Sequence, residues 1–222
     1  MNDKVIFKND LVFKNEKKNV LKKMHSYDKS KKGSLDDEIR ELVFLINSLE
    51  DYYTTSSCSG RIMLIKVDKN RRKDKSEWLY VTHKIAKFEE INKELFEGIK
   101  KTRGGDSIWL KQEPLILHVC AKNFESANKL LNMARESGLK KSGIITLSHR
   151  IIIEIEGTEN ISTLVAKNEK AKKMVLVNEL YLRMLVEEAN KKMLLNQEKN
   201  NRFFDRIKRE FKIENKNEKN EQ

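Results

Sequence analysis

Tyr52-Tyr53-Thr54-Thr55-Ser56-Ser57-Cys58-Ser59-Gly60-Arg61 is the stretch around which the fold of this chain can be worked out. Its side chains after the two tyrosines are small, so they fill little of a core but carry many hydrogen-bonding groups. Gly60 permits a tight turn, and the Arg61 guanidinium can bind a carboxylate or a phosphate. The spacing alone also fits an ordinary Ser/Gly loop. We therefore predict a polar turn between two regular elements.

Regular elements are predicted on both sides of this turn. Ser34 is an expected N-cap for a helix whose apolar residues recur at helical spacing through Leu49, and residues 62–67 alternate as a strand does. The remaining apolar runs predict further helices and strands: helices within 5–24, 89–100 and 124–134, and strands at 78–83, 107–111, 115–120, 144–147 and 151–155. Some strands follow one another without a helix between them. This order favours an α+β fold, with a mixed β-sheet flanked by helices.

The character of the chain changes towards its C-terminus. From Ala166 to about Phe211 there is no proline or glycine, and helix formers dominate. We therefore expect an α+β domain over residues 1–165 and a long basic helical extension over residues 166–222, with a frayed end. Apolar residues can share one face of this helix, which leaves open whether it packs on the domain or forms an oligomer.

Composition and charge narrow the class of protein. The chain has 222 residues, of which 36% are charged, and a formal net charge of +12, which favours an anionic partner such as nucleic acid. A lysine-rich solvated surface without such a partner is the alternative. The N-terminus does not read as a signal peptide, and no apolar run approaches the ~18 residues of a membrane span, so we expect a soluble cytoplasmic protein.

Several kinds of site are not supported by the sequence. The chain contains no G-x-G-x-x-G and no P-loop motif. Its two cysteines, Cys58 and Cys120, are far apart and belong to no C-x-x-C pair, which argues against structural zinc but leaves a disulfide open. Because His, Cys and carboxylates do not cluster at ligand spacing, we expect no catalytic metal.

Five short motifs occur in an order that resembles one known family. They lie at 29–36 (KSKKGSLD), 56–61 (SSCSGR), 78–83 (WLYVTH), 111–119 (KQEPLILHV) and 137–144 (SGLKKSGI). Together they resemble the methyltransferases of wybutosine synthesis, which methylate a ring nitrogen of a tricyclic guanosine derivative beside the anticodon of phenylalanine tRNA. The resemblance implies a catalytic domain over residues 1–165 that uses S-adenosylmethionine outside the usual doubly wound fold, with the anticodon loop of tRNA-Phe as its partner.

The resemblance also implies which residues form the site. We expect the methyl donor to be bound by residues of two glycine-containing motifs: Ser56, Ser57, Cys58, Gly60, Arg61, Ser142 and Gly143. We expect substrate contacts from cationic and aromatic side chains: Arg61, Trp78, Lys111, Lys140 and Lys141. An acceptor nitrogen that carries a proton needs a base, for which the candidates are His83, Glu113 and His118.

Each of these residues also has a purely structural interpretation. The histidines can be hydrogen-bonded core residues, and Glu113 can fix the turn at Pro114. Trp78 can belong to the core, and Cys58 is more often a small packing group than a nucleophile.

The whole chain has a rival interpretation as well. A non-catalytic basic RNA-binding module also explains the charge, though not the order of the motifs, and a methyltransferase of another RNA or of a small molecule is a third option. Where the partner is RNA, its candidate contacts are residues 69–75, Lys140, Lys141 and the basic face of the C-terminal helix.

Overall fold

The computed structural model describes residues 10–27, 35–70, 72–170 and 172–212. Within these ranges the chain forms helices α1 (Asp10–Tyr27), α2 (Asp37–Ser48), α3 (Phe88–Lys100), α4 (Phe124–Glu136) and α5 (Glu179–Glu210). The strands are β1 (Tyr52–Cys58), β2 (Arg61–Val67), β3 (Glu77–Thr82), β4 (Ser107–Glu113), β5 (Ile116–Ala121), β6 (Gly143–Thr146), β7 (Ile151–Glu156), β8 (Ile161–Glu169) and β9 (Lys172–Val175). A short 3-10 helix, η1 (Lys73–Lys75), precedes β3.

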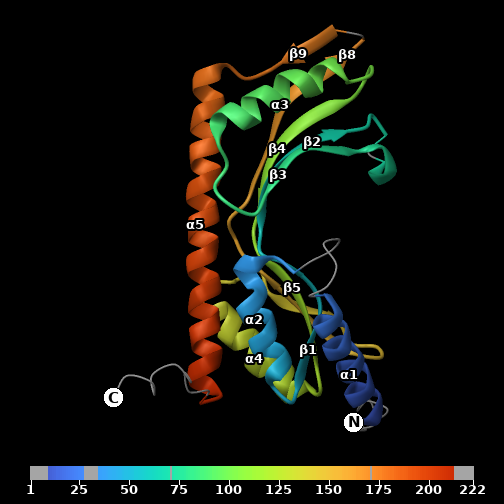
Figure 1. The fold of residues 1–222 in the computed structure, drawn as a ribbon, viewed down its shortest axis with the longest axis vertical. Helices are drawn as coiled ribbons and strands as arrows, with labels where there is room; N and C mark the ends of the chain where they lie inside the picture. The colour runs from blue at the N-terminus through green and yellow to red at the C-terminus, as the bar shows by residue number, and fades with distance from the viewer. Residues whose placement is uncertain (1–9, 28–34, 71, 171, 213–222) are drawn as a thin grey trace. The chain divides into compact units, whose positions relative to one another are not determined.

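The strands form two sheets, with the orders β1-β5-β7-β6 and β3-β2-β4-β8-β9 (Figure 1). Every strand pair in both sheets is antiparallel. The α+β class and the long C-terminal helix are therefore confirmed, whereas the sequence favoured a single mixed sheet. None of the helices in the described part of the chain is both long and apolar enough to cross a membrane.

The chain divides into two compact units that are discontinuous in sequence. The first unit comprises Met1–Cys58, Leu115–Thr158 and Gln197–Gln222, and the second comprises Ser59–Pro114 and Glu159–Asn196. The boundary predicted at residue 165 falls inside β8, and residues 166–169 and 172–175, expected to begin the helix, are strand. The lack of proline and glycine did not distinguish helix from strand here. Val165 and Ala166 are buried in the second core, and the chain turns at Lys170 (φ 48°) into β9.

In the first unit, helices lie on both faces of the sheet. Tyr52 and Tyr53 are adjacent on β1, so their side chains point to opposite faces. The Tyr52 hydroxyl donates to the Ser126 carbonyl of α4, while Tyr53 packs on Phe13 of α1 with ring centroids 5.1 Å apart. Helices α2 and α4, together with Phe203 and Ile207 of α5, bury the apolar residues of one face. Helix α1 covers the other face (Figure 1).

In the second unit, one face of the sheet packs against α3 and the first part of α5. Ile62 and Leu64 of β2 lie in one core with Leu95 of α3 and with Val186 and Met193 of α5. Burial alternates along β4, so its residues at odd positions point to the opposite face. That face therefore carries Trp109, Lys111 and Glu113 of β4, and Arg61 of β2 lies opposite Glu113 on it.

The Ser-rich stretch, predicted to be a turn, is mostly strand. Residues 52–58 form β1, and only Ser59 and Gly60 separate it from β2. The two tyrosines and two threonines that open the stretch favour extended structure, and their pairing with β5 carries the smaller residues into the sheet. The predicted N-cap Ser34 and most of the motif at 29–36 lie outside the described residues.

Candidate active site

The structure divides the predicted site residues between the two units. The second unit holds those near the Ser59–Gly60 turn: Gly60, Arg61, Trp78, His83, Lys111 and Glu113. The first unit holds the others: Ser56, Ser57, Cys58, His118, Lys140, Lys141, Ser142 and Gly143.

In the second unit, the turn at Gly60 strongly favours glycine. Gly60 has φ +102°, a conformation that L side chains rarely adopt. A Cβ at this position would lie 2.9 Å from the Glu113 carbonyl oxygen and 2.9 Å from Asn196 Nδ2. Asn196, fully buried on α5, donates from this Nδ2 atom to the Ser59 carbonyl at 2.8 Å. The turn is therefore fixed by backbone conformation and by a buried amide.

Arg61 follows the turn and pairs with Glu113 across the sheet. The two residues are opposite each other on β2 and β4, and Nε and Nη2 of Arg61 both lie 2.9 Å from Glu113 Oε2. The guanidinium also lies over the ring of Trp78, 4.9 Å from its centroid, while that indole remains about half exposed. Because Nη1 carries further N–H donors and the side chain is 27% exposed, Arg61 can still bind an anion.

His83 lies just beyond β3 and contacts the same turn. Its Nδ1 is 2.8 Å from the Gly60 carbonyl oxygen and 3.3 Å from Ser59 Oγ. Since a carbonyl oxygen only accepts hydrogen bonds, Nδ1 must carry the proton. In the neutral imidazole the lone pair is then on Nε2, as a general base requires.

In the first unit, predicted site residues form a row across the sheet. Ser56 is opposite His118, His118 is opposite Glu154, and Glu154 is opposite Gly143. His118 Nε2 lies 2.7 Å from Glu154 Oε2, and both side chains are about one quarter exposed. The row lies on the face opposite the apolar core, because the neighbours of His118 on β5, Leu117 and Val119, point into that core.

Ser142 and Gly143 differ sharply in what surrounds them. The buried Ser142 hydroxyl donates to the Leu139 carbonyl at 2.6 Å and accepts from the Glu156 amide at 3.1 Å, so it stabilises the start of β6. A Cβ on Gly143, in contrast, would meet nothing within 4 Å. Gly143 therefore borders open space.

The other predicted residues lie at the edges of these clusters. Lys141 Nζ is 3.4 Å from Glu156 Oε1, and Lys140 is exposed beside it. Lys111 is half-buried two residues before Glu113 on the same face of β4. Ser57 and Cys58 are partly buried at the end of β1.

Sequence reasoning did not identify two residues that organise these clusters. Asn196 holds the Ser59–Gly60 turn, and Glu154 binds His118. Asn196 continues the apolar stripe of α5 through Ala189 and Met193, and a polar residue in such a stripe indicates a buried contact. Glu154 carried no comparable signal, because it lies between isoleucines on a strand that alternates in burial.

Comparison with known proteins identifies the family. Residues 15–209 match the family model described as "Methyltransferase TYW3". A tRNA(Phe) 7-((3-amino-3-carboxypropyl)-4-demethylwyosine(37)-N(4))-methyltransferase 2 of Pyrococcus abyssi is 40% identical over 160 residues, which cover 72% of this chain and 73% of that protein. A tRNA wybutosine-synthesizing protein 3 homolog of Xenopus laevis is 38% identical over 180 residues, which cover 79% of this chain and 68% of that protein.

Solved structures agree with this assignment. The structure of the PH1069 protein from Pyrococcus horikoshii has a TM-score of 0.76 and 36% identity, over 88% of this chain and 95% of that one. A hypothetical protein from Aeropyrum pernix has a TM-score of 0.65 and 28% identity, over 78% of this chain and 98% of that one. Because the family model matches residues 15–209 of the 222 in this chain, the chain belongs to the TYW3 methyltransferase family.

Proposed function

We propose that this chain transfers a methyl group to N4 of the 7-(3-amino-3-carboxypropyl)-4-demethylwyosine nucleotide at position 37 of tRNA(Phe). The observation that carries the proposal is the family match over residues 15–209, together with relatives of 35–40% identity whose names specify this reaction. The net charge of +12 agrees with an RNA substrate.

We propose S-adenosylmethionine as the methyl donor. In this compound the methyl group is bound to a positively charged sulfur. The sulfur becomes a neutral thioether when the methyl group is transferred, so it is a good leaving group. The residues of the second unit fit a polar ligand with a carboxylate, because Arg61 has donors beyond those that bind Glu113.

The protein's main contribution to methyl transfer is positioning. Holding the reacting atoms in line can supply roughly 7–11 kcal/mol of the barrier. The turn at Gly60 and the ion pair of Arg61 with Glu113 suit this role, because both fix side chains where β2 begins and β4 ends. Trp78, half exposed beside Arg61, can stack on a planar base.

His83 is the best-placed residue to accept a proton from the acceptor nitrogen. Its Nδ1–H is held by the Gly60 carbonyl, which leaves the lone pair of the neutral ring on Nε2. Glu113 is less suitable because it is engaged by two nitrogens of Arg61. His118 is the alternative base and is oriented by Glu154.

The test is methylation of the proposed substrate by the purified protein. tRNA(Phe) carrying the demethylwyosine precursor is incubated with labelled S-adenosylmethionine, digested to nucleosides and analysed by mass spectrometry. We expect one methyl group to be added to the tricyclic base. Donor binding measured by calorimetry without product would indicate another acceptor, whereas no donor binding would reject the enzyme.

The roles of Arg61 and Glu113 can be separated by substitution. We expect Arg61→Ala to weaken donor or substrate binding beyond any loss of stability, because the guanidinium has donors that Glu113 does not use. Glu113→Gln breaks the ion pair but leaves the guanidinium in place. Intact affinity and turnover in Arg61→Ala would show that Arg61 only stabilises the pairing of β2 with β4.

A further inference from the structure

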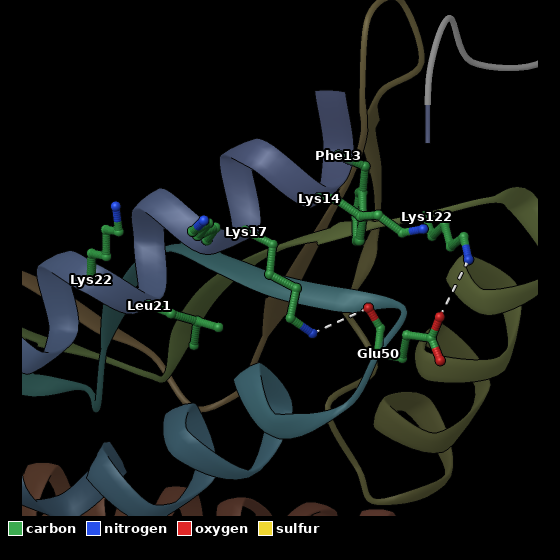
Figure 2. Close-up of a pocket in the computed structure, with 8 residues that line it drawn as sticks. Phe13, Lys14, Lys17, Leu21, Lys22, Glu50 and Lys122 are labelled. Carbon is green, nitrogen blue, oxygen red and sulfur yellow. Dashed lines mark hydrogen bonds and ion pairs between the residues drawn. The ribbon is translucent and has the colours of Figure 1, made fainter. Parts of the chain in front are cut away.

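A groove lined by lysines lies in the first unit, alongside α1. It has a volume of about 560 Å³ and is bordered by α1 and by the segments that carry Glu50 and Lys122 (Figure 2). Five of the lining residues are lysines: Lys14, Lys17, Lys18, Lys22 and Lys122. Phe13 and Leu21 supply the apolar lining, and Glu50 is the single acidic residue.

The groove side of α1 carries two stripes of residues at helical spacing. Phe13, Lys17 and Leu21 recur every four residues, as do Lys14, Lys18 and Lys22, so each set runs along the helix. The side chains of the second set are exposed and form a row of positive charges that we name the lysine stripe. Like charges four residues apart weaken a helix by a few tenths of a kcal/mol per pair, so helix stability does not explain this row.

Lys17 has a different role from the lysine stripe. Its Nζ donates to the backbone carbonyls of Leu49 and Glu50, which follow the last turn of α2. Burial lowers the pKa of Lys17, although Asp51 and Glu50 act in the opposite direction. Figure 2 shows this side chain pointing away from α1 towards Glu50. Lys17 therefore joins α1 to the α2–β1 connection.

Further contacts fix α1 on the sheet. The Tyr53 hydroxyl donates to Glu16 Oε2 at 2.6 Å, and Arg150 forms an ion pair with the other oxygen of that carboxylate. Phe13 packs on the Tyr53 ring. The lysine stripe is thus presented by a helix that is anchored through Phe13, Glu16 and Lys17, so binding a partner would not require the helix to be ordered first.

We propose that the lysine stripe and its groove bind the phosphodiester backbone of the RNA substrate. Successive members of the stripe are separated by a helical rise of about 6 Å, which suits a regularly spaced polyanion better than a single small anion. Lysine is a point charge that contacts phosphate without reading bases, so the surface positions the RNA and does not select its sequence. Phe13 and Leu21 can contact sugar or base faces. The inference rests on the proposed function only in taking tRNA as the RNA.

The test compares two variants with the same change in net charge. In the first, Lys14, Lys18 and Lys22 of the stripe are changed to Gln, which has a similar helix propensity to Lys. In the control, Lys93, Lys100 and Lys101 at α3 of the second unit are changed to Gln. Both variants and the wild-type full chain are titrated with a tRNA(Phe) transcript over a range of salt concentrations, after their thermal midpoints have been shown to agree.

We expect the stripe variant to bind tRNA about 10–100-fold more weakly at low salt, and the slope of log K against log salt to fall by roughly 2–3. The control should change both quantities much less. Restoring the stripe with Arg at all three positions should recover both. Equal effects of the stripe and control substitutions would overturn the proposal, as would a wild-type chain that does not bind tRNA.

Two further readouts separate this proposal from others. If the wild-type chain methylates tRNA and the stripe variant binds like the control, the surface is wrong and the proposed function stands. If the stripe variant loses RNA binding while even the wild-type chain transfers no methyl group, the surface stands and the proposed function fails. A stripe variant that loses binding to phosphatidylserine vesicles but not to tRNA would identify a membrane surface and overturn the RNA proposal.

Discussion

His83 is oriented by the backbone of the turn that it contacts, and this suggests a substitution that separates orientation from chemistry. Asn at position 83 keeps an N–H near the place of Nδ1 but removes Nε2. We therefore expect His83→Asn to retain the thermal midpoint and to lower turnover by about 10²–10⁴-fold, the usual contribution of a general base. Single-turnover methylation checks this: the chemical step should slow in the variant while donor affinity, measured by calorimetry, stays at the wild-type value.

The matched control is His118→Asn, which removes the contact with Glu154 in the first unit. If this variant, and not His83→Asn, slows the chemical step with donor affinity unchanged, then the base is His118. If both retain wild-type turnover, the histidines hold the structure and the proton leaves to water.

Gly60 and Gly143 give opposite expectations for the same substitution. Gly60 has a positive φ, and its added Cβ would meet the Glu113 carbonyl, so Gly60→Ala should lower the free energy of unfolding by about 1–3 kcal/mol. Gly143→Ala should leave stability within about 0.5 kcal/mol of wild type, since the new methyl group enters open space. Urea unfolding of both variants measures these changes. A stable Gly143→Ala variant that no longer binds the donor would show that a ligand approaches this backbone closely.

At the scale of elements, the sequence predicted helices better than strands. The stripe of Ile39, Leu42, Val43 and Ile46 correctly predicted α2, because one apolar face at helical spacing has few other interpretations. For residues 56–58 the sequence predicts a turn where the structure has a strand, because small polar side chains can occupy either, and their pairing with residues 116–118 is non-local. The same ambiguity applies to residues 166–175, which contain nothing that breaks a helix.

The junction of α2 and β1 depends on one buried side chain. Asn47 accepts from the Thr54 amide at 3.0 Å and donates to the Thr54 hydroxyl and to the Val43 carbonyl. Thr54 precedes an irregularity in the pairing of β1 with β5, so this side chain satisfies a backbone group there. We expect Asn47→Ala to lower the free energy of unfolding by about 1–3 kcal/mol, because it leaves buried polar groups unpaired.

Chemical denaturation of Asn47→Ala measures this cost, with Ser48→Ala as the comparison. Ser48 is the next residue on α2 and only donates to a carbonyl of its own helix, that of Leu45. A cost for Asn47→Ala no larger than that for Ser48→Ala would contradict the role assigned to the junction.

At the scale of the whole molecule, the motifs identified candidate residues but not their arrangement. Arg61 and Glu113 are separated by 52 positions and meet because β2 and β4 pair in a particular register, which no local pattern specifies. Asn196 and Glu154 contact site residues that are distant in sequence, so no motif that contains those site residues could identify them. The division of the site residues between two discontinuous units could not be foreseen, because the residues that mark three of the four crossings, Gly60, Pro114 and Gly157, occur equally in turns within one domain.

The stability of the whole chain should fall in alkali because of the two tyrosines of β1. Burial and the nearby Asp51 raise the pKa of Tyr52 to about 12, and burial, Cys120 and Glu16 raise the pKa of Tyr53. The folded chain thus keeps phenolic protons that the unfolded chain loses near pH 10. Their contribution is fully present below pH 10 and declines as the pH rises from 10 towards 12, by up to about 1.4 kcal/mol per pH unit for each tyrosine.

Urea midpoints measured from neutral pH to above pH 10 test this dependence. Tyr52→Phe removes one of the two ionising groups, so its stability should fall less steeply with pH, even though the variant starts lower because it lacks the hydrogen bond to the Ser126 carbonyl. Tyr181→Phe is the control, since this half-exposed side chain on α5 contacts water in the folded chain. If Tyr52→Phe and wild type lose stability in parallel above pH 10, then ionisation of Tyr52 does not cause the loss of stability in alkali.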